Sequence, residues 1–392
     1  STNKAKYITY GTGWTMNGTK FNLTGTGVTS GTYETSYSSL VGKYLAMSQY
    51  GFDFVDIGST TAGTMKTTTN IYALAYVVSA TADNIEYKFL TSNKNTTESL
   101  LTSTQDDYGM SYYFRGAVKN NYVEFANKCW RIVRIVGDGS VKLVLHNDNI
   151  SNSSNPCSSM NNSDEAAFAH YSGSTYVSAF NSNYNDNAYI GFMYGQAGSS
   201  DYASTHANTN KSTILTNLEA WYDKNNLKDY EKVIADTVWC NDKTNVTDTS
   251  YDPWSITPNG LGYAKNVTYY GATKRLVGTS GSAGGTGPSL KCNGELSKIN
   301  SKVGLITADE LAFAGYAWNI GNTTTYLQEN ATDTYWWSLS PGDFGGCHGI
   351  LCFIGVWSVY GRDGIFSRGV VHNAVYVRPS ISLKSTTNVT GE

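Results

Sequence analysis

The side chains best suited to chemistry include five histidines, and their spacing matches no metal or acid–base motif. Metal-binding histidines usually recur within a few residues of one another or of cysteines. His348 and His372 could share acid–base work if the fold joined them, but we favour surface contact residues as the interpretation. Residues 147–149 and 183–187 offer oxygens to Ca²⁺ but lack the spaced aspartates of a calcium loop, so we predict loops there. The five histidines are His146, His170, His206, His348 and His372.

Familiar catalytic motifs are absent from the sequence. It contains no H-E-x-x-H, no G-x-S-x-G and no G-x-x-x-x-G-K-[ST]. Segment 281–287 has the glycines of a phosphate loop but lacks the lysine, and Pro288 follows it, so we predict a surface loop. The adjacent carboxylates Asp309 and Glu310 are explained by a capping box that begins at Thr307. We therefore predict no catalytic residue, no metal and no cofactor, and a protein that is not an enzyme.

The six cysteines point to disulfides. No pair has the C-x-x-C spacing of a zinc site, and an even count in a chain with 15% charged residues indicates an oxidising, extracellular compartment. Fifteen pairings exist, and six unpaired buried thiols are the alternative. We predict the sequential pairing, with the last pair less secure than the first two. The pairs are Cys129–Cys157, Cys240–Cys292 and Cys347–Cys352.

Charge and hydropathy limit the partners. The net charge is −3 and no basic stripe is visible, so we predict no nucleic-acid binding. No apolar run reaches the roughly 18 residues that a membrane helix needs. A membrane is therefore expected to be involved only through an N-terminal anchor that precedes Ser1.

The first 95 residues are predicted to form a β-rich domain, a stalk or pilin-like part. Segments 72–78 and 85–90 are typical strands on either side of a turn, and 37–48 is the one helix candidate in this part. Residues 96–107 are polar and are expected to be a connector.

Residues 108–392 are predicted to form a second domain of the α+β class, with two helices, short antiparallel strands and long irregular loops. The clearest signal is a hairpin of 130–136 and 141–145, with Asp138-Gly139 in its turn. Ser212 caps a predicted helix through Leu227, and the capping box opens a second helix over 310–317. The other expected elements are strands at 122–125 and 377–383 and loops at 146–163 and 278–288.

Segment 342–376 has an unusual composition. It is crowded with Phe, Ile, Val, Tyr, His, Arg and Gly, shows no helical or strand periodicity along its length, and contains no Lys, Glu, Gln or Met. Except for Trp357, its residues all belong to the set encoded by codons that end in a pyrimidine.

The residues that frame this segment resemble the C-terminus of variable proteins of diversity-generating retroelements. The frame is Trp336-Trp-Ser-Leu-Ser-Pro341 before it and Val377-Arg-Pro-Ser-Ile-Ser-Leu383 after it. The resemblance covers about residues 105–385 and is specific only as a combination of motifs. Further motifs similar to those of the gut-bacterial surface proteins of this kind are Ser111-Tyr-Tyr-Phe-Arg-Gly116, Trp130-Arg-Ile-Val-Arg-Ile135, Cys240-Asn-Asp242, Tyr269-Tyr-Gly-Ala272 and Gly304-Leu-Ile-Thr-Ala-Asp-Glu-Leu-Ala-Phe-Ala-Gly315.

The resemblance implies a C-type-lectin-like fold of the formylglycine-generating-enzyme branch, in which template-directed mutagenesis diversifies a ligand-binding surface. The expected protein is an extracellular, pilus- or surface-associated adhesin for an unknown protein or glycan on another cell or host surface. Framework residues would pack inward: Trp336, Trp337, Val356, Val359 and Val377. Ligand-contacting residues would be Asp343, Phe344, His348, Ile350, Phe353, Ser358, Tyr360, Arg362, Phe366, Arg368, His372, Asn373 and Tyr376. Among these, Phe353, Tyr360, Phe366 and Tyr376 could equally be core residues.

Two alternatives stay open at this point. An enzyme of the formylglycine-generating branch would need reactive cysteines in a cleft, for which only Cys347 and Cys352 qualify, without a matching motif around them. A structural surface or pilus subunit, for which ligand binding is incidental, would assemble with itself in solution.

Overall fold

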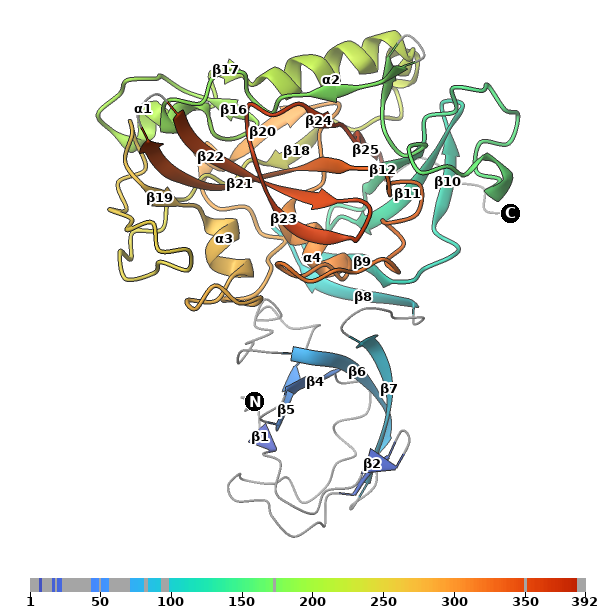
Figure 1. Ribbon diagram of the computed structural model, residues 1–392. Helices are drawn as coiled ribbons and strands as arrows, with labels where there is room; N and C mark the ends of the chain where they lie inside the picture. Colours follow the sequence, from blue (N-terminus) through green and yellow to red (C-terminus); the bar gives the residue numbers. More distant parts are fainter. Residues whose placement is uncertain are drawn as a thin grey trace.

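The computed structural model describes residues 99–171, 174–348 and 351–385, together with seven strands within the first 92 residues. These seven strands form one antiparallel sheet in the order β1-β5-β4-β6-β7-β3-β2 (Figure 1). The two strands predicted at 72–78 and 85–90 are confirmed as β6 and β7, which pair with each other. The strands are β1 Tyr7–Ile8, β2 Met16–Asn17, β3 Lys20–Asn22, β4 Tyr44–Ser48, β5 Gly51–Val55, β6 Ile71–Ala80 and β7 Asn84–Ser92.

The helix predicted at 37–48 is wrong where the structure describes it. Residues 44–48 form β4, which is hydrogen-bonded to β5 on one side and β6 on the other. Ladder pairing on both edges satisfies the backbone of this short segment, which outweighs its weak helical pattern. Residues 37–43 lie outside the described residues.

A six-stranded sheet opens the C-terminal part, with the order β25-β12-β11-β9-β8 and β10 paired to β11. The predicted hairpin is confirmed as β11 and β12. Its turn forms because Asp138 Oδ1 accepts a hydrogen bond from the Ser140 N–H at 2.8 Å and Gly139 takes a φ of +86°. The strands are β8 Ser99–Gln105, β9 Met110–Gly116, β10 Tyr122–Phe125, β11 Lys128–Ile135, β12 Val141–Asn147 and β25 Ser380–Leu383.

The structure differs from the connector predicted at 96–107. Residues 99–105 are β8, which pairs with β9 along its whole length. The strand was missed because it is an edge strand made largely of Ser and Thr, so polarity alone suggested a loop.

A second six-stranded sheet contains most of the unusual segment 342–376. Its order is β15-β24-β21-β22-β23, with β19 paired to β21. β22 shows no alternation of polar and apolar residues because both faces of the sheet are covered: Ile354 and Val356 join one core cluster, and Trp357 and Val359 join the other. The strands are β15 Val177–Ser178, β19 Thr268–Tyr269, β21 Tyr335–His348, β22 Leu351–Tyr360, β23 Ile365–Val370 and β24 Val375–Tyr376.

The described part of the chain has four short α-helices, so the fold is of the mixed α+β class. The two predicted helices are confirmed as α2 Thr213–Lys224, capped by Ser212, and α4 Ala308–Ala314, with its capping box complete. The prediction of only two helices is wrong, because α1 Tyr202–His206 and α3 Gly271–Leu276 were missed. Helices of five or six residues are too short to show a periodic pattern. Three two-stranded sheets complete the described elements: β13 His170–Tyr171 with β14 Ser174–Thr175, β16 Met193–Tyr194 with β17 Asn210–Lys211, and β18 Thr237–Cys240 with β20 Lys298–Ser301.

Two core clusters hold the β21–β24 sheet on its two sides. One contains Trp221 of α2 and Ile354 of β22, and the other contains Leu311 of α4 and Trp357 of β22. Figure 1 shows α2 and α4 on opposite sides of this sheet. The sheet is therefore a buried scaffold whose side chains have little freedom to move.

Two predicted disulfides are confirmed. Cys129 is bonded to Cys157 and Cys240 to Cys292, with Cα–Cα distances of 5.0 and 5.4 Å. Cys352 is disulfide-bonded too, and Cys347 lies opposite it across β21 and β22.

Removal of the Cys240–Cys292 bond by the double substitution Cys240→Ala and Cys292→Ala is expected to lower the free energy of unfolding by about 2–4 kcal/mol. The bond closes a separation of 52 residues that contains the irregular chain before β20, so it removes much entropy from the unfolded state. Guanidinium unfolding followed by tryptophan fluorescence measures the change. An unchanged midpoint would contradict the expectation, and Cys129→Ala with Cys157→Ala provides a second bond for comparison.

Candidate ligand-binding surface

The framework residues of the unusual segment are buried, as predicted. Trp336, Trp337, Val356, Val359 and Val377 are each fully shielded from solvent. The Trp337 indole N–H donates a hydrogen bond to the Ser178 carbonyl at 2.9 Å, which connects β21 to β15, the strand on the far side of β24. These residues anchor the sheet in the core, together with buried side chains between them such as Phe344 and Phe366.

Four of the predicted ligand contacts are buried, which corrects that part of the prediction. Phe344 faces Ile354 across β21 and β22 and joins the core, and Ser358 lies opposite Trp337. Phe366 packs on Trp357 with 4.6 Å between ring centroids. Asp343 is buried as well and is treated below. The physical reason is that both faces of the sheet are covered near its middle, so these positions point into packed layers.

Four predicted contacts are exposed, and three are half-buried. Phe353 is 44% exposed, and Arg362, His372 and Asn373 are also exposed. The half-buried residues are Tyr360, Arg368 and Tyr376. The side chain of His348, which ends β21, and the whole of Ile350 lie outside the described residues.

The exposed and half-buried residues do not form a single patch. Phe353 and Tyr360 are seven residues apart on β22, a distance of roughly 24 Å at about 3.4 Å per residue. The Tyr360 ring stacks on Tyr335 at 4.5 Å, and Arg362 follows in the adjacent turn. The His372 ring lies 4.2 Å from that of Tyr184. Tyr335 and Tyr184 were not among the predicted contacts because both lie outside segment 342–376.

A charged pair with an aromatic platform lies between the two ends of β22. The Asp343 carboxylate forms an ion pair with the Arg368 guanidinium, whose Cζ lies 3.8 Å from the centroid of the Trp254 ring. Burial raises the pKa of Asp343, and the charge of Arg368 opposes that shift. The sequence offered no sign of Trp254, which belongs to an irregular loop about 90 residues earlier.

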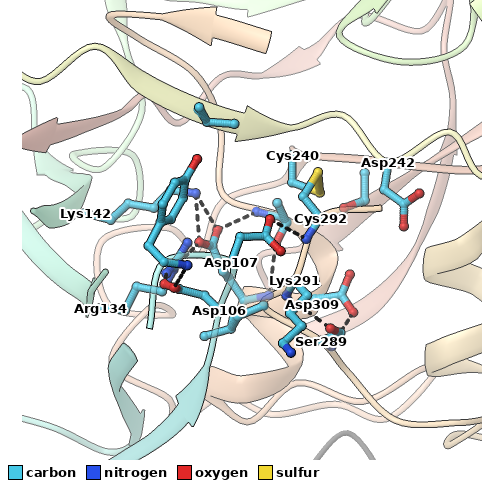
Figure 2. A pocket seen from close by; sticks show the side chains of 16 residues that line it. Asp106, Asp107, Arg134, Lys142, Cys240, Asp242, Ser289, Lys291, Cys292 and Asp309 are labelled. Carbon is cyan, nitrogen blue, oxygen red and sulfur yellow. Dashed lines mark hydrogen bonds and ion pairs between the residues drawn. A yellow bond between two sulfur atoms is a disulfide. The ribbon is translucent and has the colours of Figure 1, made fainter. Parts of the chain in front are cut away.

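A small pocket lies elsewhere, beside the Cys240–Cys292 disulfide (Figure 2). Its cavity volume is about 30 Å³. Its charged side chains pair with one another: Arg275 binds Asp242 and Asp309, each at 2.7 Å. The buried charges around this small pocket are therefore largely compensated by one another.

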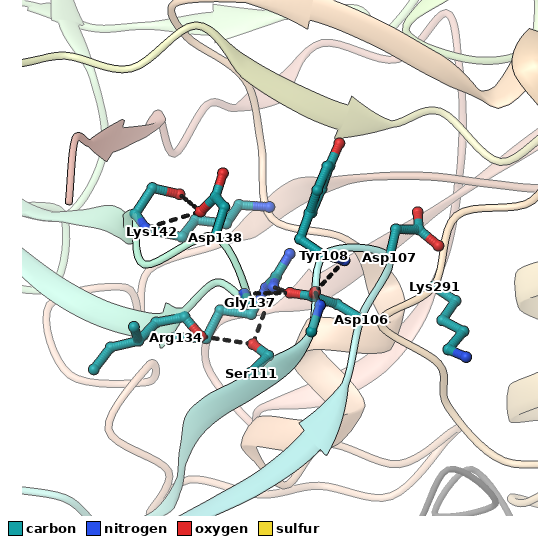
Figure 3. A network of polar contacts seen from close by, with 12 residues as sticks. Asp106, Asp107, Tyr108, Ser111, Arg134, Gly137, Asp138, Lys142 and Lys291 are labelled. Carbon is teal, nitrogen blue, oxygen red and sulfur yellow. Dashed lines mark hydrogen bonds and ion pairs between the residues drawn. The ribbon is translucent and has the colours of Figure 1, made fainter.

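The wall of this pocket is a network of buried ion pairs. Asp106 accepts hydrogen bonds from Arg134 Nη1 at 2.8 Å and from the Gly137 N–H at 2.9 Å (Figure 3). Arg134 Nε and Lys142 Nζ both lie 2.8 Å from Glu310 Oε1. Burial lowers the pKa of Lys142 to about 8, against the attraction of Glu310. Each charged side chain of this network is paired with an opposite charge of the same network. We therefore infer that the network stabilises the fold.

The histidines are dispersed in the structure. His146 and His206 are buried, whereas His372 is exposed, and no ion-binding group of three or more His, Cys, Asp or Glu side chains occurs within the described residues. In the same part of the chain, no helix is long and apolar enough to cross a membrane. Comparison with family models, with curated proteins and with solved structures finds no match to this chain.

Proposed function

We propose that this chain is an extracellular ligand-binding protein, an adhesin or receptor-binding protein with a C-type-lectin-like C-terminal domain, which displays a diversified surface on β21, β22 and β23. Its ligand would be a protein or glycan on another cell or host surface. The chain would bind this ligand without transforming it. The disulfides support an oxidising, extracellular location.

The observation that carries the proposal is the division of roles within residues 336–377. Framework side chains such as Trp336, Trp337 and Val359 are fully buried, while Phe353, Arg362 and His372 project from the same sheet or its adjoining turns. Aromatic and arginine side chains held on a rigid scaffold give large contact area at low entropic cost. Substitution at the projecting positions would change the surface and leave the core intact.

Sequencing of the 3′ end of the gene across its source population tests this function. We expect amino-acid replacements to concentrate in codons 342–376, at projecting positions such as 353, 362, 372 and 373. The framework codons for Trp336, Trp337 and Val377 should stay constant. The β11–β12 hairpin at 128–147 is the internal control for the background rate. A window that is as invariant as this hairpin would overturn the proposal.

A further inference from the structure

Asp343 is a buried carboxylate inside the segment that the proposed function treats as diversified. Its side chain is 1% exposed, and Arg368 is its ion-pair partner. Within the described part of the chain, neither carboxylate oxygen has a hydrogen bond of good geometry to another group. A buried charge without a partner is costly, so the acidic side chain at 343 depends on the cation at 368.

Arg368 is held from two directions. Arg368 belongs to β23 and lies opposite Trp357 of β22. Its guanidinium pairs with Asp343, and its Cζ lies over the ring of Trp254. Trp254 packs on Trp318 with 5.1 Å between ring centroids, and Trp318 packs on Trp357 with 5.3 Å between ring centroids. The side chain of Arg368 is 30% exposed, so part of an oriented guanidinium faces solvent. An arginine fixed in this way loses little further entropy on binding.

The space for the carboxylate comes from glycine. Gly355 lies directly opposite Asp343, and a Cβ at Gly355 would lie 2.2 Å from the Asp343 Oδ1 atom. A Cβ at Gly345 would lie 3.3 Å from Oδ2, which is tight but tolerable. Any larger residue at 355 therefore requires the Asp343 carboxylate to move from its observed position.

We infer that positions 343, 355 and 368 form a coupled set, in which an acidic residue at 343 is carried together with glycine at 355 and arginine at 368. We further infer that Trp254, outside the diversified segment, is a constant platform that displays the residue at 368 to the ligand. The role in binding rests on the proposed function, whereas the coupling is a property of the fold. The orientation of the residue at 368, and with it the ligand specificity there, would thus depend on Trp254 and on the buried residue at 343, which does not contact the ligand.

A double-mutant cycle tests the coupling in the full chain. Thermal unfolding is compared for the wild type, Asp343→Ser, Arg368→Ser and the double variant. We expect Arg368→Ser to lower the midpoint by about 5–10 °C, because it leaves the carboxylate buried and unpaired, and the double variant to regain at least half of that loss. The exposed Lys211–Glu219 pair, removed by Lys211→Ala and Glu219→Ala, is the matched control and should show near-additive, small shifts.

Additive effects at 343 and 368 would overturn the coupling. If Arg368→Ser alone does not fold but its combination with Asp343→Ser does, that rescue demonstrates the coupling, whereas failure of both variants to fold would overturn it. Population sequences provide the second test. Acidic residues at 343 should co-occur with arginine at 368 and glycine at 355, and Trp254 should not vary. Independent variation at these codons would overturn the inference and leave the proposed function standing. An invariant segment would overturn the proposed function, and the cycle would then decide the coupling alone.

Discussion

Replacement of Glu310 by alanine is expected to lower the free energy of unfolding by about 3–5 kcal/mol, because it leaves Lys142 buried without a counter-charge and deprives Arg134 of one of its two carboxylate partners. The Glu310 side chain is 2% exposed and contacts Lys142 at 2.7 Å and Arg134 at 2.8 Å. Its carboxylate also accepts the Thr307 N–H at 2.9 Å and closes the capping box of α4. Burial acts to raise the pKa of Glu310, but the charges of Lys142 and Arg134 outweigh it and lower the pKa to about 2.

Glu219→Ala is the matched control for this prediction. Glu219 pairs with Lys211 at the same distance of 2.7 Å, but these side chains are 37% and 52% exposed. An exposed pair of this kind contributes less than about 1 kcal/mol. Guanidinium unfolding of both variants, followed by tryptophan fluorescence, measures the difference. Similar losses in the two variants would show that the Glu310 network does not stabilise the fold as we argue.

Local signals in the sequence located the elements that depend on local chemistry. Ser212 and Thr307 cap α2 and α4 because their hydroxyls accept the N–H groups of Leu215 and Glu310, three residues ahead, and a capping pattern of this kind is visible in the sequence. The Asp138-Gly139 turn likewise specified the β11–β12 hairpin. In each case the determining atoms lie within a few residues of one another.

Features that depend on distant residues could not be predicted in this way. Strands β21 and β22 lack alternation because helices and loops cover both their faces, and this covering is known only from the fold. The burial of Asp343 depends on Gly355 and Arg368, and the platform for Arg368 is Trp254, from a loop that no local pattern connects to it. The sequence therefore indicated a candidate segment and its buried framework residues, but not which of the remaining positions are buried.

The burial of two histidines likewise depends on distant residues and could not be predicted from local sequence. His146 and His206 were treated as members of a dispersed set, yet the structure buries both. The Nε2 atom of His206 lies 2.6 Å from the Gly262 carbonyl oxygen and 3.1 Å from the Tyr270 hydroxyl. Burial, followed by the charge of Lys243, lowers the pKa of His206 to about 3. Burial and the nearby Arg131 and Arg378 lower the pKa of His146 to about 2.

We expect the protein to lose about 4 kcal/mol of stability between pH 7 and pH 5. The unfolded histidine pKa is about 6.5, so below that pH the unfolded chain binds protons that the folded His146 and His206 do not. Each histidine then costs about 1.4 kcal/mol per pH unit, and the stabilisation present above pH 6.5 is lost progressively as the pH falls towards 3. Guanidinium unfolding at both pH values measures the loss. His206→Gln should remove about half of the pH dependence, whereas His372→Gln, at an exposed position, should leave it unchanged. Equal stability at pH 7 and pH 5 would mean that the two buried rings take up protons in the folded state, which burial and the charges of Lys243, Arg131 and Arg378 should prevent.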